Sequence, residues 1–375
     1  MKKYLITILL AFAFIFTGCT VNVNTIAKPV ANLPIIHEEE FGGAYIRITI
    51  EDFNALGYEY GDSVDVILSN GYEFNNIPYY NGYYAKNGDI MLLAYPGYDY
   101  IKLVISNGAD IWERSNLTDK MFASIYLNGR GEYLEIQNAR DIHYTDERDD
   151  YDSDEIFANF RAIKVSGLKE NYIYRSASPC DNRHNRASYA DKLASKAGVN
   201  YILDLADTKD KIEGYLTSQD FDSAHFKSLY DLGNVNPIAM NMNYDSEEFK
   251  KKVATGIKEM ANNSGPYLIH CTEGKDRTGY VCMLIEALVG ASYEDIKNDY
   301  MITYNNYYGV TRESDEKRYD ILVSDVLDPM IRSMANDEKL DLNNANLSEA
   351  AKNFLIETGL SEAEVDDIKN KLSSY

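Results

Sequence analysis

Residues 270–279, which read HCTEGKDRTG, hold the side chains with the clearest capacity for chemistry. An apolar strand pattern leads into Cys271 and a helical pattern follows the loop, so backbone N–H groups can converge on one anion at a helix N-terminus. Arg277 follows six positions after the cysteine, and its planar guanidinium can hold two phosphate oxygens. These positive surroundings favour a thiolate at Cys271. We expect the thiolate to attack phosphorus and water to hydrolyse the resulting phosphocysteine.

This loop resembles the Cys-x5-Arg signature of the protein tyrosine phosphatase superfamily. The Lys275-Asp276 pair narrows the resemblance to the bacterial tyrosine phosphatase-like group, whose secreted members act on phosphotyrosine and on phosphoinositides. Three further segments resemble that group: YRSAS at 174–178, DLAD at 204–207 and IKNDY at 296–300. The resemblance covers residues 156–375 and implies an α/β phosphatase domain with a mainly parallel sheet, in line with strand and helix patterns that alternate there.

The resemblance gives each residue of the loop a role. Cys271 is the nucleophile, Arg277 binds phosphate and stabilises the transition state, and Asp276 is the general acid that protonates the leaving oxygen. His270 orients the loop through hydrogen bonds. The remaining substrate-binding positions are Thr272, Glu273, Gly274, Lys275 and Thr278, of which the last donates its hydroxyl to the sulfur of the nucleophile.

Several residues near these segments allow more than one interpretation. Asp245 is the alternative acid, because it precedes the motif as the mobile-loop aspartate does in related phosphatases, and Asp207 is a third candidate. Cys180 is either a structural thiol or a reversible disulfide partner of the nucleophile. Cys282 faces an apolar helical stripe, which indicates a core position. Arg175 is either a base of the pocket or a surface ion pair.

Two departures from the family pattern bear on the substrate. Ala206 stands where the group carries the arginine of DLR, and Glu273 replaces a small neutral residue. Both changes disfavour very anionic ligands, so we expect a phosphotyrosine protein or peptide, with phosphoinositides or inositol phosphates as the alternative. The alternative from another functional class is a binding protein: a non-catalytic lipoprotein that binds phosphorylated ligands. Inactive relatives usually lose the cysteine or the arginine, whereas this chain keeps both.

The first residues resemble the export signal of a bacterial lipoprotein. Two lysines precede an apolar run over residues 4–16, and Thr17-Gly18-Cys19 follows it. We therefore expect residues 1–18 to be a signal peptide and Cys19 to carry lipid at the outer face of the bacterial cell membrane. An ordinary signal peptide or membrane anchor with an incidental cysteine is the alternative.

The rest of the chain is predicted to form two domains. Residues 19–35 read as a tether, and residues 36–145 as a β-rich accessory domain, a small antiparallel sandwich or barrel. Its alternating runs end in Asn70-Gly71, Asn107-Gly108 and Asn128-Gly129. Asn-Gly after such a run is the strongest short-range hairpin signal. The acidic run 146–155, DERDDYDSDE, is the expected linker, and residues 156–375 form the catalytic domain.

Charge and composition limit the partners. The chain of 375 residues has a formal net charge of −22, which argues against nucleic acid because phosphate backbones need clustered Lys and Arg. No His/Cys cluster has the spacing of metal ligands along the sequence, so the sequence predicts no metal and no cofactor. The expected partners are a phosphorylated protein, lipid or inositol phosphate and, through the N-terminal lipid, a membrane.

Overall fold

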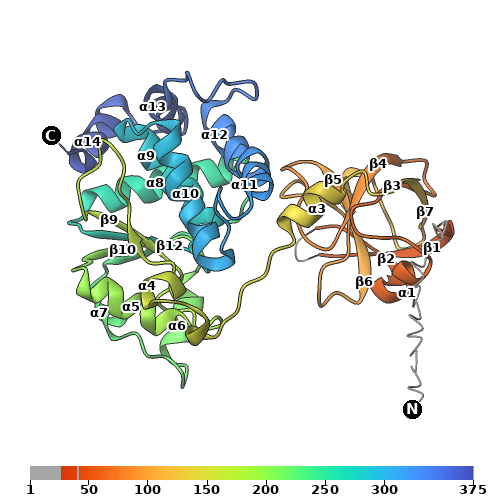
Figure 1. Cartoon of the computed structure of the whole chain (residues 1–375), viewed down its shortest axis with the longest axis horizontal. Helices are drawn as coiled ribbons and strands as arrows, with labels where there is room; N and C mark the ends of the chain where they lie inside the picture. The colour runs from red at the N-terminus through yellow and green to blue at the C-terminus, as the bar shows by residue number, and fades with distance from the viewer. Residues whose placement is uncertain (1–26, 40–41, 375) are drawn as a thin grey trace, which may run out of the picture.

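The computed structural model describes residues 27–39 and 42–374, which form two bodies joined by an extended segment (Figure 1). The predicted signal peptide and the predicted lipidation site, Cys19, lie outside the described residues. Within the described part, no helix is both long and apolar enough to cross a membrane. We call the first body the barrel and the second the C-terminal body.

The barrel is a closed sheet of seven strands in the order β1-β2-β6-β5-β4-β3-β7. Alternate side chains such as Ile46, Val64 and Ile125 are fully buried inside it, as the alternating sequence pattern requires. The β4–β5 pairing is parallel, whereas the other barrel pairings are antiparallel, so the expectation of a purely antiparallel domain was wrong at this pair. The strands are β1 (Val30–His37), β2 (Ala44–Thr49), β3 (Ser63–Leu68), β4 (Glu73–Tyr80), β5 (Ile90–Leu93), β6 (Tyr100–Ile105) and β7 (Phe122–Gly129).

Only one of the three Asn-Gly signals makes a hairpin between paired strands. Asn70-Gly71 joins β3 to β4, which pair antiparallel. Asn107-Gly108 instead leads into α2 (Ile111–Arg114), and Asn128-Gly129 leads towards α3 (Leu134–Arg140). In both cases the strand already has a partner on each side: β6 lies between β2 and β5, and β7 lies between β3 and β1. The chain must therefore leave the sheet after the turn.

Two predicted boundaries differ from the structure. β1 begins at Val30, inside the expected tether, because it pairs with β2 and β7 and so closes the barrel. The acidic run 146–155 is not a solvated linker throughout: Asp146 pairs with Arg186 and with His184, and the run contains η1 (Arg148–Asp150) and the start of α4 (Asp154–Phe157). The start of the run is thus bound, through Asp146, to a basic segment of the C-terminal body.

The C-terminal body is built on a five-stranded sheet in the order β11-β10-β12-β9-β8. β9, β12, β10 and β11 pair in parallel, and the edge strand β8 pairs antiparallel with β9. The carboxyl ends of the parallel strands therefore meet at one edge. The strands are β8 (Arg161–Ala162), β9 (Ile173–Ser176), β10 (Tyr201–Asp204), β11 (Val235–Pro237) and β12 (Tyr267–His270).

Helices cover both faces of this sheet (Figure 1). Ile202 and Leu268 pack in one buried cluster, towards α5 and α7, whereas Leu203 and Ile269 pack in another, towards α8 and α9. The helices are α1 (Ile50–Ala55) in the barrel, and α5 (Ala187–Lys196), α6 (Lys209–Leu216), α7 (Ala224–Asp231), α8 (Glu247–Asn262), α9 (Asp276–Val289), α10 (Tyr293–Tyr308), α11 (Glu316–Leu322), η2 (Val323–Leu327), α12 (Asp328–Ala335), α13 (Leu347–Glu357) and α14 (Glu362–Leu372).

Candidate active site

Cys271 lies directly after β12, the central strand of the C-terminal body, and is 3% exposed. The chain then turns over residues 271–275 and enters α9 at Asp276. Gly274 makes this turn with φ +69, and a Cβ there would lie 2.2 Å from the carbonyl oxygen of Ser176. Only glycine fits both the conformation and the space. The loop thus presses against the end of β9 and brings the thiol to the N-terminus of a helix, where an anion is stabilised.

The loop is held from behind by buried polar side chains. Arg175 of β9 donates to the carbonyl of Gly274 at 3.0 Å and to the carboxylate of Asp299 on α10 at 2.7 Å. Asn159 also donates to the Gly274 carbonyl, at 3.2 Å. Burial disfavours the charged form of Asp299, but the guanidinium groups of Arg161 and Arg175 lower the pKa of its carboxyl to about 2. Arg175 is 1% exposed, so its ion pair with Asp299 is buried rather than at the surface, and the residue supports the loop from behind.

Arg277 lies in the first turn of α9, on the same side of the loop as the thiol. It donates to the carbonyl of Met240 at 3.2 Å and to the hydroxyl of Thr272 at 3.1 Å. These contacts orient the guanidinium over a cavity of about 300 Å³, which we call the Cys271 cavity. Its lining residues are Arg183, His184, Asn241, Met242, Cys271, Thr272, Glu273, Asp276 and Arg277.

The candidate acids occupy different surroundings. Asp276 lines the Cys271 cavity, and its side chain is 41% exposed. Asp245 is exposed, accepts a hydrogen bond of 2.6 Å from Ser333, and is not among the residues that line the cavity. Asp207 is buried at 3% exposure and does not line it either. The geometry therefore favours Asp276 as the acid that can reach a bound phosphate ester.

Charged and aromatic side chains surround the outer part of the loop. Lys275 lies 3.3 Å from the carboxylate of Glu273 and 3.9 Å from that of Asp276, and it donates to the hydroxyl of Tyr308. Burial opposes the charge of Lys275, but the carboxylates of Asp276 and Glu273 outweigh it and raise the pKa of the ammonium. Tyr144 donates to Glu273 at 2.9 Å. The negative charge of Glu273 is thus partly neutralised by Lys275, and hydrogen-bonded by Tyr144, before any ligand binds.

Two buried residues of the motif differ in what they contact. His270 lies with Nδ1 3.3 Å from the carbonyl oxygen of Cys271, and burial lowers the pKa of the imidazole to about 4, so it is neutral. The hydroxyl of Thr278 is buried and has no hydrogen-bond partner among the described residues. The predicted donation from Thr278 to the sulfur of Cys271 is therefore not formed here, because the first turn of α9 fixes the direction of its side chain.

Other segments bring to the cavity four residues that the motif did not predict. Arg183 and His184 come from the loop before α5, and Asn241 and Met242 from the segment after β11. Arg183 pairs with Asp181 at 2.7 Å, and its side chain is 55% exposed. The run RHNR at 183–186, a local concentration of basic residues in an acidic chain, could have indicated that Arg183 and His184 lie near an anion site.

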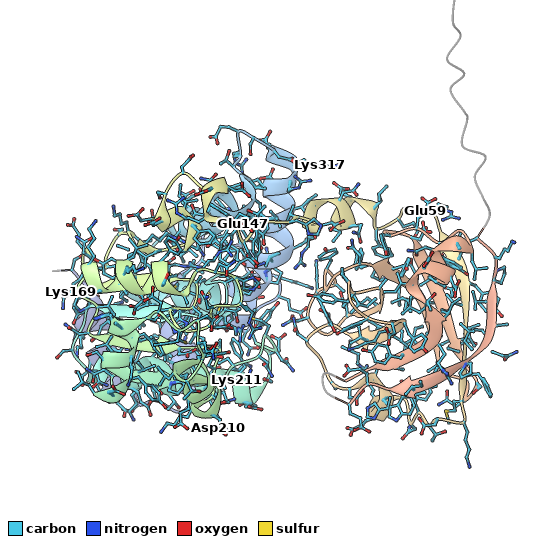
Figure 2. The ribbon with its side chains drawn as sticks, turned by 90° about the horizontal axis from the view of Figure 1, so that it is seen from below. Glu59, Glu147, Lys169, Asp210, Lys211 and Lys317 are labelled. Atoms are coloured by element: carbon cyan, nitrogen blue, oxygen red, sulfur yellow. The ribbon has the colours of Figure 1, made fainter. Side chains whose placement is uncertain are left out.

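A second and larger cavity, of about 660 Å³, lies between the two bodies, and we call it the interbody cleft. It shares Met242, Glu273 and Asp276 with the Cys271 cavity. Contacts between the bodies flank it: Asn87 donates to the carbonyl of Met242, and Lys317 on α11, which Figure 2 labels, pairs with Glu135 on α3 at 3.2 Å. Tyrosines from both bodies line the cleft: Tyr83, Tyr84 and Tyr95 of the barrel, and Tyr144, Tyr244, Tyr304 and Tyr308.

A thiol at the end of a central strand, beside an arginine and at the start of a helix, defines the class of cysteine-centred anion-binding loops. Residues 133–374 match the Tyrosine phosphatase family. The match covers more than half of the chain, and the chain belongs to this family.

Individual relatives match less of the molecule. A tyrosine-protein phosphatase of Nostoc commune is 39% identical over 57 residues, which are 15% of this chain and 19% of that protein. The chain thus spans about a fifth of the length of this curated relative. Among solved structures, the core catalytic domain of the PP-IP phosphatase SIW14 of S. cerevisiae is 19% identical, with a TM-score of 0.27, over 48% of this chain and 91% of that domain. P. aeruginosa TpbA is 14% identical, with a TM-score of 0.23, over 56% of this chain and 95% of that one.

Proposed function

We propose that this protein is a cysteine-dependent phosphatase that hydrolyses phosphate monoesters through a phosphocysteine on Cys271. The observation that carries the proposal is the convergence of Cys271, Arg277 and Asp276 on one cavity at the N-terminus of α9. This arrangement supplies a nucleophile, a phosphate ligand and a proton donor within reach of the same ester. Membership of the tyrosine phosphatase family supports the same chemistry.

The reaction takes two steps. The thiolate of Cys271 attacks phosphorus, an S–P bond forms, and the P–O bond to the leaving group breaks while Asp276 gives its proton to that oxygen. Water, deprotonated by the same carboxylate, then attacks phosphorus and breaks the S–P bond, which restores the thiolate and releases phosphate. Arg277 and the loop N–H groups hold the equatorial oxygens as charge spreads over them.

The interbody cleft favours a phosphotyrosine peptide as the substrate. The cleft continues from the Cys271 cavity, and its tyrosine lining suits an extended peptide with apolar or aromatic side chains. Four carboxylates (Asp141, Glu273, Asp276 and Asp325) line the cleft beside three cations (Lys86, Arg140 and Lys275), so the cleft offers no excess of positive charge to a ligand that carries several phosphates. Phosphoinositides and inositol phosphates are therefore the second choice within the same mechanism.

The substrate proposal predicts that the barrel contributes to peptide recognition. Tyr95 of the barrel lines the cleft and is 42% exposed. We expect Tyr95→Ala to lower kcat/KM for a phosphotyrosine peptide about three- to tenfold, the size of one lost aromatic contact, and to leave turnover of a small aryl phosphate unchanged. A panel of phosphopeptides, phosphoinositides and inositol phosphates measures both quantities.

Tyr72→Ala is the matched control, because Tyr72 is also a barrel tyrosine, is 41% exposed and does not line the cleft. It should leave both substrates unaffected. A higher kcat/KM for an inositol phosphate or a phosphoinositide than for every peptide would overturn the assignment of a protein substrate but not the reaction. Absence of turnover with the whole panel would remove the proposed function itself.

We also propose that the chain is a lipoprotein held at the outer face of the bacterial cell membrane by Cys19. The support is the charged start, the apolar run and the small residues before Cys19 in the sequence. Replacing Cys19 with alanine should move the protein, expressed in its bacterial host, from the membrane fraction to the soluble exported fraction. If the Cys19→Ala protein stays in the membrane fraction after high-salt washing, an uncleaved anchor is the better explanation.

A further inference from the structure

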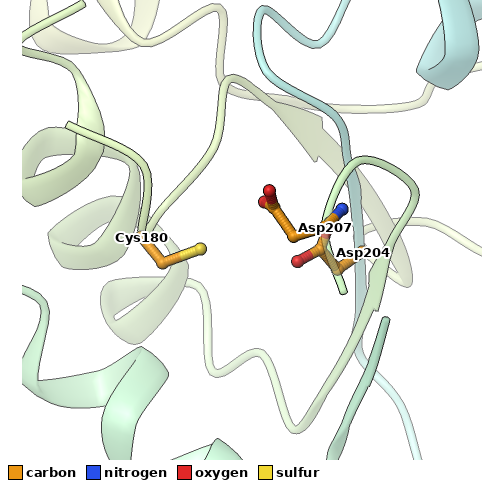
Figure 3. Close-up of side chains that lie close together, drawn as sticks. All are labelled: Cys180, Asp204 and Asp207. Atoms are coloured by element: carbon orange, nitrogen blue, oxygen red, sulfur yellow. The ribbon is translucent and has the colours of Figure 1, made fainter. Parts of the chain in front are cut away.

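Three buried side chains from two separate segments of the sequence meet at the carboxyl edge of the sheet. Cys180 comes from the loop after β9, Asp204 ends β10, and Asp207 follows it; their side chains point towards one another (Figure 3). One sulfur and one oxygen from each carboxylate lie within 4.8 Å of one another. The three residues are 2%, 0% and 3% exposed, respectively. The group is therefore an enclosed set of one thiol and two carboxylates.

Each carboxylate has one satisfied oxygen and one without a partner. Oδ1 of Asp204 accepts from the backbone N–H groups of Ala206 and Asp207, at 2.9 and 3.1 Å. Oδ1 of Asp207 accepts from the hydroxyl of Tyr215 at 3.2 Å. The other oxygen of each, Oδ2, is buried and has no hydrogen-bond partner among the described residues. A buried carboxylate oxygen without a partner is costly, so the native state must supply a proton or a cation there.

The surrounding charges do not supply that cation. Among the described residues, neither Asp204 nor Asp207 forms an ion pair with a lysine or an arginine. Asp181 lies close enough to raise the pKa of both further, and its own carboxylate is already paired with Arg183. Arg277 lowers the pKa of Asp204, but its guanidinium donates its hydrogen bonds to Met240 and Thr272. The group thus has an excess of negative charge in a desolvated place.

His270 adds a fourth donor atom at the edge of the group. Its Nδ1 lies against the carbonyl of Cys271, which can only accept, so Nδ1 carries the proton and Nε2 presents a lone pair. Nε2 is buried, has no hydrogen-bond partner among the described residues, and lies 3.9 Å from Oδ2 of Asp204. Two acceptors facing each other repel unless a proton or a metal cation lies between them.

We propose that Cys180, Asp204 and Asp207 bind a divalent cation of the zinc type, with Nε2 of His270 as the fourth ligand or as the acceptor for a metal-bound water. Thiolate, carboxylate and imidazole are the ligands of Zn²⁺, and ligand atoms of a tetrahedral site lie about 3.5 Å apart, so shifts of about 1 Å bring the three side chains to the spacing of zinc ligands. The ion would then join the loops after β9 and β10 to the loop that begins at Cys271, through His270. Because the site is enclosed, the ion is taken up as the chain folds.

This assignment was not accessible from spacing along the chain, because Cys180 and His270 follow or end other strands than the two aspartates, and only the parallel strand order brings them together. It goes beyond the proposed function, and its test measures bound metal independently of turnover. The rival explanation is that protons neutralise the group, since burial raises the pKa of Asp204 and of Asp207 to about 6 each.

The experiment uses the full chain carrying Cys271→Ser, which removes the thiol of the active site as a competing zinc ligand, purified without metal-affinity chromatography. Elemental analysis after expression with zinc should find about one zinc ion per chain. Replacement by Co²⁺ should give the near-ultraviolet absorption of a cobalt–thiolate bond. Adding Cys180→Ala should abolish both signals, whereas Cys282→Ala, which removes a buried thiol outside the group, should leave them intact.

A second variant guards against simple misfolding. Asp207→Asn keeps the shape of the side chain and should weaken zinc retention during dialysis against a chelator at least about tenfold, with an unchanged circular dichroism spectrum. A chelator should lower the Tm of the Cys271→Ser chain and leave that of its Cys180→Ala derivative unchanged. Absence of zinc from the Cys271→Ser chain, or retention of zinc after Cys180→Ala, would overturn the proposal in favour of a protonated group.

Discussion

Replacing Cys271 with serine is expected to lower the hydrolysis of an aryl phosphate by about 10⁴-fold or more. The serine hydroxyl is almost un-ionised at neutral pH, and neither the helix N-terminus of α9 nor Arg277 can stabilise an alkoxide enough to replace a thiolate. The backbone N–H groups and Arg277 remain in place, so phosphate and substrate should still bind. The measurement is steady-state turnover together with the affinity for a phosphopeptide.

Cys282→Ser is the matched control for this prediction. Cys282 is a fully buried thiol on α9, so the same chemical change there tests whether loss of any buried thiol suffices. The control should keep turnover within a few-fold if it remains folded by circular dichroism. Rapid quenching of the unmodified protein should also trap phosphate on the peptide that contains Cys271.

Two outcomes would change the conclusion. Turnover by Cys271→Ser equal to that of the unmodified protein would remove the phosphocysteine mechanism. Phosphopeptide binding by the unmodified protein, without turnover of any member of the substrate panel, would instead support the non-catalytic lipoprotein that binds phosphorylated ligands.

Replacing Asp276 with asparagine is expected to lower kcat about 10²- to 10³-fold for a phosphate ester with a poor leaving group. Asparagine cannot donate a proton to the leaving oxygen, so the effect should be much smaller for an activated aryl ester whose leaving group needs no protonation. This dependence on the leaving group separates loss of the acid from a general disturbance of Lys275, which lies 3.9 Å from the carboxylate. The measurement is kcat across a series of leaving groups.

Asp245→Asn is the matched comparison. Asp245 is bonded to Ser333 and does not line the Cys271 cavity, so the substitution should leave kcat unchanged along the whole series. The reverse pattern, an unaffected Asp276→Asn and a leaving-group-dependent loss in Asp245→Asn, would show that the segment after β11 moves onto the substrate during the reaction and carries the acid.

The local chemistry of the site could be predicted from the sequence because it is encoded within one short stretch. Cys271, Asp276 and Arg277 are placed by a strand, a turn and a helix that follow one another directly. The turn requires a positive φ, and Gly274 supplies it. The same holds for the hairpin at Asn70-Gly71, where turn and paired strands are adjacent in the chain.

Long-range partners could not be predicted in this way. The alternating pattern of the barrel strands indicates a half-buried surface but not which strands pair, so the Asn-Gly turns after β6 and β7 gave a false hairpin signal. The role of Arg175 likewise depends on Asp299, which lies on a distant helix. Side-chain type alone does not distinguish a pocket base from a buried support.

The sequence by itself determined that Cys271, Asp276 and Arg277 belong to one loop between a strand and a helix, because strand, turn and helix signals act over a few residues. The tertiary structure decided which distant groups meet that loop. It places Arg175 behind Gly274, the barrel tyrosines beside the Cys271 cavity, and Cys180 against Asp204. The physical reason is that strand order and packing of the two bodies set these contacts, and both depend on burial summed over the whole chain rather than on any local motif.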